Sequence, residues 1–368
     1  MNTTQNITPL YATHPGEILL DELKAINVSQ SDFATQIGLK RSQLNEIIKG
    51  KRNINADLSL LLEKALGIDA DYWLEAQKNF DLDTARINNK NQIRLEAIEQ
   101  WGLIKEHVAW RFFKKESILV GDPVEDIPMV KKIYNVQNFE QLVNLKAQPT
   151  YARFRKSTKL INDPVNIIGW VKLIQYKSQT IQVASFDNDN KVLLMENLKR
   201  LLAENKNTLE RVKQLLSEFG IKLIYQQKGE KTPVDGISFW SDGNPAIGMS
   251  LRHKRLDNYA FTLFHELGHI YEHLVNNNNA EFVDLINSRE DETYKDSIEE
   301  KEANDFAHNF LMDNTAWNNF FERNLSFSDP LIISFAQEIG VHPSIVRGRV
   351  CYTINQYAAK TNIDYSIG

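Results

Sequence analysis

Hydrophobic and polar positions follow helical patterns over the N-terminal part of the chain. Between Pro15 and about Phe80, short helical patterns are separated by single turns, which predicts a compact all-helical domain. Between about Asp81 and about Leu216 the sequence stays helical and becomes more charged, with the clearest apolar spacing in residues 95–108, 138–145 and 193–216. This second region is therefore expected to be a helical connector.

The hydrophobic pattern changes to that of strands after about residue 216. Three short stretches rich in strand formers are separated by Gly, Pro and Asp, and they cover residues 221–225, 236–240 and 246–250. They predict a small antiparallel sheet, whose stretch 246–250 is expected to offer an edge to which an extended peptide adds. Helical spacing then returns, in one helix from about Asp257 to Val275 and another from about Ser297 to Met312.

These patterns together predict a mainly α fold with a small antiparallel sheet, in the α+β class. We expect three parts, which are residues 1–85, a connector over 86–216 and a last domain over 217–368. A chain of 368 residues with 42% hydrophobic content is longer than one core usually supports, so two or three packed units are the expected outcome.

Composition narrows the setting in which the chain is expected to work. Its one cysteine, Cys351, excludes an internal disulfide, and its start lacks a basic segment followed by an apolar run, so we expect a reducing cytoplasm. No stretch approaches the roughly 20 apolar residues that span a bilayer, and membrane insertion is not expected. A net charge of -5 argues against general coating of nucleic acid but allows a local basic patch.

The first domain carries the pattern of a helix-turn-helix. This motif needs a small residue where two helices approach, a turn residue between them and apolar residues that fix their angle. Phe33 and Ala34 are placed to face the partner helix, and Gly38 can adopt the positive φ of the turn. Leu44 and Ile47 then hold the second helix. This agreement predicts a DNA-binding unit.

The second helix of this motif and its exit hold the local basic patch, against the single acid Glu46. Its basic side chains would neutralise phosphates, while Gln43, Asn45 and Arg41 have the groups to bond base edges in the major groove. Gln30 would bond a phosphate from the start of the first helix. The alternative is a protein-interaction module with a solvated basic face. The predicted DNA-binding residues are Gln30, Lys40, Arg41, Ser42, Gln43, Asn45, Lys49, Lys51 and Arg52.

The first domain also resembles a known family. Residues 14–19, 53–58, 67–68 and 72–74 closely resemble HigA-type antitoxins of the XRE repressor class, and the resemblance covers about Thr13 to Asp83. It implies a repressor-like fold of five helices, dimeric binding to a double-stranded operator and often autoregulation. Operators of this class are usually palindromic, so symmetry matching implies a homodimer.

The last domain contains the pattern of a zinc peptidase. His265 and His269 are four residues apart, so on one helix both imidazoles lie on the same face and can bind one Zn²⁺. Glu266 would then take a proton from a water molecule that attacks a peptide carbonyl, and return it to the leaving amine. The alternative is a pair of surface histidines. His273 lies about 12 Å along the axis from His265 at the rise of a helix, so it is expected to cap the helix or to support the ligands.

The third zinc ligand is expected on the next helix, because a catalytic zinc site normally has three protein ligands and an open position. Periodicity does not choose between the carboxylates there, since Glu299 lies near the centre of the buried face and Glu302 at its margin. The candidates are Glu299, Glu300, Glu302 and Asp305.

A second resemblance selects among these carboxylates. Residues 255–269 and 302–307 look like the ImmA/IrrE metallopeptidase family, and the resemblance spans about Arg153 to Gln356. It implies a gluzincin-like site in which Glu302, directly before Ala-Asn, is the third ligand, with Glu299 in reserve. His342 would either stabilise an oxyanion or, as a turn-forming or core residue, support the fold.

Two hypotheses follow for the whole chain. In the first, a zinc endopeptidase cleaves a regulatory protein, such as a repressor or a toxin–antitoxin partner, and its DNA-binding domain places it at an operator. In the second, an antitoxin-like autorepressor uses the zinc domain as a sensor with little or no proteolysis. Glu266 favours the first, because a structural zinc site needs no general base. A relic domain that only stabilises the fold is a third possibility.

Overall fold

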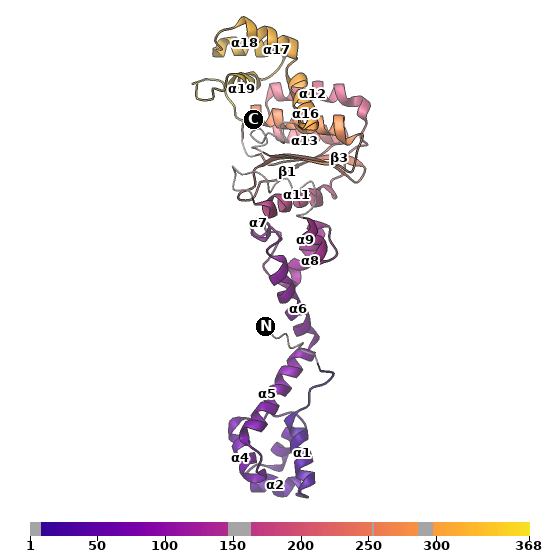
Figure 1. Cartoon of the computed structure of the whole chain (residues 1–368), viewed down its shortest axis with the longest axis vertical. Helices are drawn as coiled ribbons and strands as arrows, with labels where there is room; N and C mark the ends of the chain where they lie inside the picture. Colours follow the sequence, from indigo (N-terminus) through magenta and orange to yellow (C-terminus); the bar gives the residue numbers. More distant parts are fainter. Residues whose placement is uncertain (1–8, 146–162, 252–253, 286–296) are drawn as a thin grey trace. The chain divides into compact units, whose positions relative to one another are not determined.

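The computed structural model describes residues 9–145, 163–251, 254–285 and 297–368. The chain divides into two compact units, Met1–Trp101 and Gly102–Gly368 (Figure 1). Each unit has its own buried core, which fits the expectation of more than one packed unit. The finer boundaries at residues 85 and 216 stay a prediction.

The first unit is helical throughout its described residues. Its helices are α1 (Pro15–Ala25), α2 (Gln30–Gln36), α3 (Arg41–Ile48), α4 (Ala56–Leu66) and α5 (Ala70–Ile87), and α6 (Asn89–Ile104) runs across the boundary to the second unit. Phe33, Leu44, Ile47 and Trp73 are all buried in one core. The five helices of the predicted repressor-like fold are therefore present.

Local signals set the helix ends of this unit. The Ser29 hydroxyl accepts a hydrogen bond from the Asp32 N–H at 3.2 Å and caps α2. Gly38 connects α2 to α3 with a φ of 71°, a left-handed conformation that glycine adopts without steric cost. The turn between the two helices is thus fixed where the sequence pattern places it.

The second unit begins with helices that lead to a sheet. They are α7 (Trp110–Lys115), α8 (Pro123–Tyr134), α9 (Phe139–Leu145), α11 (Pro164–Ser178), the short 3-10 helix η2 (Asn188–Asn190), α12 (Lys191–Glu204) and α13 (Thr208–Glu218). The sheet consists of β1 (Lys222–Tyr225), β2 (Val234–Ser241), β3 (Asn244–Met249) and β4 (Glu281–Leu285), in the order β1-β3-β2-β4.

The sheet is mixed, whereas the strand pattern predicted antiparallel pairing. β2 pairs antiparallel with β3 and β4, but β1 and β3 run parallel. The reason is topological: β2 and β3 form a hairpin, and β3 then inserts between β2 and β1. Because β3 is paired on both sides, the expectation that residues 246–250 offer an edge to a peptide is wrong for this strand.

Helices cover the two faces of the sheet (Figure 1). α11 packs on one face, and α14 (Leu256–Gly268) packs on the other. α14 continues into the π-helical turn η3 (His269–Leu274), and the two together occupy the range predicted for a single helix. The chain then continues through α16 (Ile298–Leu311), α17 (Asn314–Arg323), α18 (Asp329–Ile339) and α19 (Pro343–Ile354).

The fold class predicted from the sequence, mainly α with a small sheet, is confirmed. Within the four described ranges, no helix has both the length and the apolar character that crossing a membrane requires.

Candidate metal centre and nucleic-acid interface

Helix α14 and the turn η3 that continues it bury the two predicted histidine ligands on one face. Leu263, Phe264 and Leu267 anchor the helix in the core, and this packing fixes the rotation of the helix. His265 and His269 are both buried, and their Nε2 atoms lie 3.1 Å apart. The two imidazoles therefore face a common point, as the spacing of four residues predicts.

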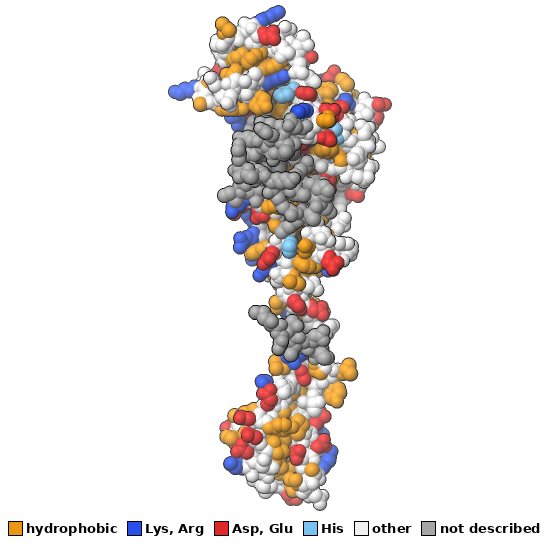
Figure 2. Space-filling view, in the orientation of Figure 1, with side chains coloured by type: hydrophobic (Ala, Val, Ile, Leu, Met, Phe, Trp, Pro, Cys, Tyr) orange, Lys and Arg blue, Asp and Glu red, His pale blue; other side chains and the backbone are white. Residues whose placement is uncertain are grey.

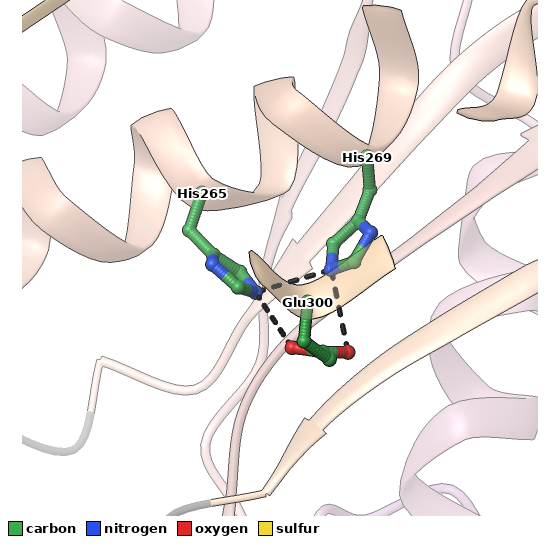
Figure 3. A group of neighbouring side chains, drawn as sticks. All are labelled: His265, His269 and Glu300. Atoms are coloured by element: carbon green, nitrogen blue, oxygen red, sulfur yellow. Dashed lines mark hydrogen bonds and ion pairs between the residues drawn. The ribbon is translucent and has the colours of Figure 1, made fainter. Parts of the chain in front are cut away.

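Glu300 completes this group from the first turn of α16 (Figure 3). Its Oε2 lies 3.3 Å from His265 Nε2, and its Oε1 lies 3.6 Å from His269 Nε2. One ligand atom from each residue lies within 4.8 Å of the others, and all three side chains are buried. Two imidazoles and one carboxylate form the donor set of a catalytic zinc site, so these residues fit the ion.

The charges around this group favour a cation. Burial disfavours the charged form of His265, but the hydrogen bond to Glu300 and the charges of Asp284, Glu266 and Glu300 outweigh it and raise its pKa to about 9. Asp284 lies on β4 opposite Gly236 of β2. The surrounding carboxylates thus stabilise positive charge at the imidazole nitrogens, where a metal ion would sit.

Glu266 is completely buried beside the two histidines, against strand β2. The Ser238 hydroxyl donates to Glu266 Oε2 at 2.5 Å, whereas no group in the described part of the chain donates to Oε1. Gly236 leaves room for this carboxyl group, because a Cβ at this position would overlap it. Burial raises the pKa of Glu266 well above its ordinary value, opposed by the charge of His265 and by the Ser238 hydrogen bond and reinforced by Asp284. Burial therefore favours the protonated form of this carboxyl group.

Each histidine has an outer hydrogen-bond partner at its Nδ1. His265 Nδ1 lies 3.2 Å from Asn304 Oδ1, and His269 Nδ1 lies 3.2 Å from His273 Nδ1. His273 Nε2 in turn lies 3.0 Å from Glu302 Oε2. The structure therefore places Glu302 outside the metal group, to which it is linked through the His273 ring.

The third position beside the histidines is thus occupied by Glu300 and not by Glu302 or Glu299. The Glu302 side chain is 55% exposed, and that of Glu299 is exposed and accepts a hydrogen bond from the Ser297 hydroxyl. On α16, Ala303 and Ala307 face the core, and Glu300 precedes Ala303 by three residues, on the same side of the helix. Glu302 is rotated away from that side by its two-residue offset from Glu300.

His342 has a structural place. Its Nδ1 accepts a hydrogen bond from the Ser344 N–H at 3.2 Å and caps α19. The turn-forming interpretation of His342 is therefore confirmed. Ser238, Gly236 and Asn304 were not foreseen at the site. Gly236 and Ser238 alternate along β2 and so share one face, but no local signal indicates that this face meets α14.

The helix-turn-helix unit presents most of the predicted DNA-binding residues at its surface. Gln30, Gln43 and Asn45 are half-buried, and the exposed residues are Lys40, Arg41, Ser42, Lys49, Lys51 and Arg52. Gln43 also has a role inside the fold, because its Oε1 accepts a hydrogen bond from the Lys40 N–H at 3.0 Å. The contacts to DNA stay a prediction.

Family models match both units. A helix-turn-helix family model matches residues 19–73, and the model of the IrrE N-terminal-like domain, a peptidase family, matches residues 216–350. Virulence-associated protein I of Dichelobacter nodosus is 41% identical over 75 residues, which are 20% of this chain and 69% of that protein. Virulence-associated protein A of the same organism is 34% identical over 77 residues, which are 20% of this chain and 74% of that protein.

A solved structure is also similar to part of this chain. An addiction module antidote protein of a HigA family from Coxiella burnetii is 31% identical, covers 24% of this chain and 96% of its own, and has a TM-score of 0.23. The sequence matches fall on the unit that contains α2 and α3 and on the unit that contains the metal group. The chain therefore belongs to the helix-turn-helix family through its N-terminal residues and joins this DNA-binding domain to an IrrE-like peptidase domain.

Proposed function

We propose that this protein is a zinc-dependent endopeptidase that acts from an operator-bound position and cleaves a regulatory protein. The observation that carries the proposal is the buried group of His265, His269 and Glu300 with Glu266 beside it. His265 and His269 would hold Zn²⁺ through Nε2, and Glu300 through its carboxylate. When bound, zinc polarises the substrate carbonyl and lowers the pKa of a nearby water molecule.

Glu266 is the proton carrier in this proposal. Ser238 fixes its Oε2, so Oε1 is the atom that accepts the proton of the attacking water and later gives it to the leaving amine nitrogen. Burial raises the pKa of this carboxyl group, which favours its holding the proton between the two steps.

The DNA-binding unit is proposed to dock α3 in the major groove of a double-stranded operator. The exposed basic side chains around α3 support phosphate contacts. A homodimer on a palindromic site is supported by three apolar side chains exposed on α4 and α5, which are Leu60, Leu61 and Tyr72. Figure 2 also shows hydrophobic side chains gathered over the middle of this unit. The free cysteine Cys351 fits a reducing cytoplasm.

The substrate is proposed to be a repressor or a toxin–antitoxin partner. A second function, a sensor-repressor with little proteolysis, is favoured by one observation: all four side chains of the group, Glu266 included, are buried. A substrate must reach these groups to be cleaved, whereas a sensor only has to retain the ion.

The test measures bound zinc and proteolysis on the full chain. Purified wild type, Glu300→Gln and Glu266→Gln are compared, with exposed Glu299→Gln as the matched control on α16. Cleavage is followed on labelled casein, on the chain itself and on proteins encoded beside its gene. We expect one zinc in wild type, in Glu299→Gln and in Glu266→Gln, and none in Glu300→Gln.

Cleavage is expected in wild type and in the control only. Wild type that binds no zinc would contradict the metal centre. Zinc binding without cleavage of any of these proteins would favour the sensor-repressor, and operator affinity with and without zinc would then be compared.

A further inference from the structure

We propose that Glu302 and His273 form an outer hydrogen-bond chain that orients His269 and strengthens its binding of the metal, so that Glu302 is a positioning residue. This inference rests on the zinc site proposed above. The chain runs from Glu302 Oε2 to His273 Nε2 at 3.0 Å, and from His273 Nδ1 to His269 Nδ1 at 3.2 Å.

The hydrogen bonds of this chain allow one assignment of protons. His269 Nε2 faces His265 and Glu300, so as a ligand it must be unprotonated and Nδ1 must carry the proton. His269 Nδ1–H then donates to His273 Nδ1. His273 consequently carries its own proton on Nε2, which donates to the Glu302 carboxylate. Every ring nitrogen in the chain thus has a defined role, which fixes the tautomer that binds a metal.

Local structure holds the two rings in this arrangement. His269 and His273 both lie in the π-helical turn η3, where the wider turn changes the alignment of residues four apart. Phe282 of β4 stacks on the His269 ring at a centroid distance of 4.5 Å and also contacts the His273 ring at 5.2 Å. The rings are thus clamped by an apolar neighbour as well as by hydrogen bonds.

The two ligand histidines differ in what supports them. His265 faces the neutral amide of Asn304 directly, whereas His269 is linked to the charge of Glu302 through a second imidazole. His273 is 10% exposed in its side chain, and Glu302 is 55% exposed, so the carboxylate lies at the surface and its effect reaches the ligand through a mostly buried ring. A carboxylate linked to a ligand imidazole orients the ring and increases its basicity.

Helix α16 therefore supports the metal centre at three alternate positions. Glu300 lies with the ligands, Glu302 acts on His269 through His273, and Asn304 contacts His265. This arrangement gives a role to Glu302, the carboxylate directly before Ala303-Asn304, although Glu302 does not itself contact the metal group.

The test is zinc affinity, measured on the full chain by competition with a coloured chelator. Because His273→Phe keeps a ring against Phe282 but cannot accept a hydrogen bond, we expect it to weaken zinc binding by about 10- to 100-fold while one zinc still binds at saturation. Glu302→Ala should weaken it in the same direction. The double variant should be no weaker than His273→Phe alone, because Glu302 acts only through His273.

Asp305→Asn, an exposed carboxylate change on the same helix, is the matched control and should leave the affinity unchanged. Equal melting temperatures of the metal-free variants would exclude a general folding defect, and Glu302→Gln provides a milder second variant. Complete loss of zinc in Glu302→Ala with wild-type affinity in His273→Phe would overturn the proposal and make Glu302 a ligand. Additive losses, or no loss in either variant, would also overturn it. Wild type without zinc would instead defeat the proposed function itself.

Discussion

The two units place their candidate functional side chains in opposite environments. Around α3, most of the predicted DNA-binding side chains project from a completed apolar core into solvent. At the candidate metal centre, the side chains lie inside the core and form hydrogen bonds with one another and with their neighbours. The exposed side chains of the first site can therefore change at little cost to the fold, whereas the second site is built by the same packing that stabilises its unit.

The largest expected effect tests the chemistry of the buried site. Glu266→Gln keeps the shape of the side chain but removes the group that carries the proton, so cleavage should fall by about 10²- to 10⁴-fold. Zinc content should stay that of wild type, because Glu266 is not one of the three residues that face the metal position. Turnover of labelled casein and zinc content measured on the same samples check both statements. Unchanged turnover would remove Glu266 from the mechanism.

The next effect tests how closely the buried site is packed. Gly236→Ala places a methyl group against the Glu266 carboxyl group, and overpacking of this kind costs about 1–3 kcal/mol. Urea unfolding of the second unit measures the loss. The matched control is Gly102→Ala, since nothing lies near a Cβ there, and it should be neutral or slightly stabilising in helix α6. Equal stability of the two variants would show that β2 can move away from α14.

The same contrast explains what the sequence could predict. Helix periodicity places His265 and His269 on one face and Phe33, Leu44 and Ile47 in one core, because these features depend on local spacing. The choice between Glu300 and Glu302 depends on the rotation of α16 against α14, which local periodicity leaves open. The resemblance implied Glu302 as the third ligand. In the structure, Glu302 contacts His273, which in turn contacts His269.

Contacts between distant segments were not predictable from local patterns. Ser238 and Gly236 meet Glu266 only because β2 packs beneath α14. The parallel pairing of β1 with β3 likewise depends on where the hairpin inserts, and the three strands would show the same alternation in either direction.

A smaller effect is expected at the exposed interface. Arg41→Ala and Lys49→Ala should each reduce the dependence of duplex DNA binding on salt by about one unit of log–log slope, because each would remove one phosphate contact. Folding stability should change by less than about 0.5 kcal/mol, since both side chains are exposed. Fluorescence anisotropy over a salt series measures the slope. Lys64→Ala on α4, whose side chain is 85% exposed, is the control; an equal change there would indicate non-specific charge effects only.

The smallest expected effect compares the two histidines that cap helices. His14 caps α1 and His342 caps α19, each through Nδ1 and each before a proline, and burial lowers the pKa of both. His14 Nδ1 accepts from the Gly16 N–H at 2.9 Å, so a proton at that nitrogen removes the cap. His342 Nδ1 also lies 2.9 Å from the Ser344 hydroxyl, which can accept from the protonated ring.

Because these histidines have a lowered pKa in the folded state, the unfolded chain binds more protons than the folded chain once the pH falls below about 6.5. The free energy of unfolding therefore decreases on acidification and is constant at higher pH. Asp81 and Glu17 oppose part of this loss at His14, and Asp364 does so at His342. Hydrogen exchange of the first turns of α1 and α19 between pH 7.5 and 5 should therefore show greater opening at α1. His14→Asn, which keeps a cap but does not titrate, should remove most of the acid sensitivity at α1. Equal opening at both helices would mean that a hydrogen bond from the protonated His342 ring to the Ser344 hydroxyl does not offset the loss of the cap.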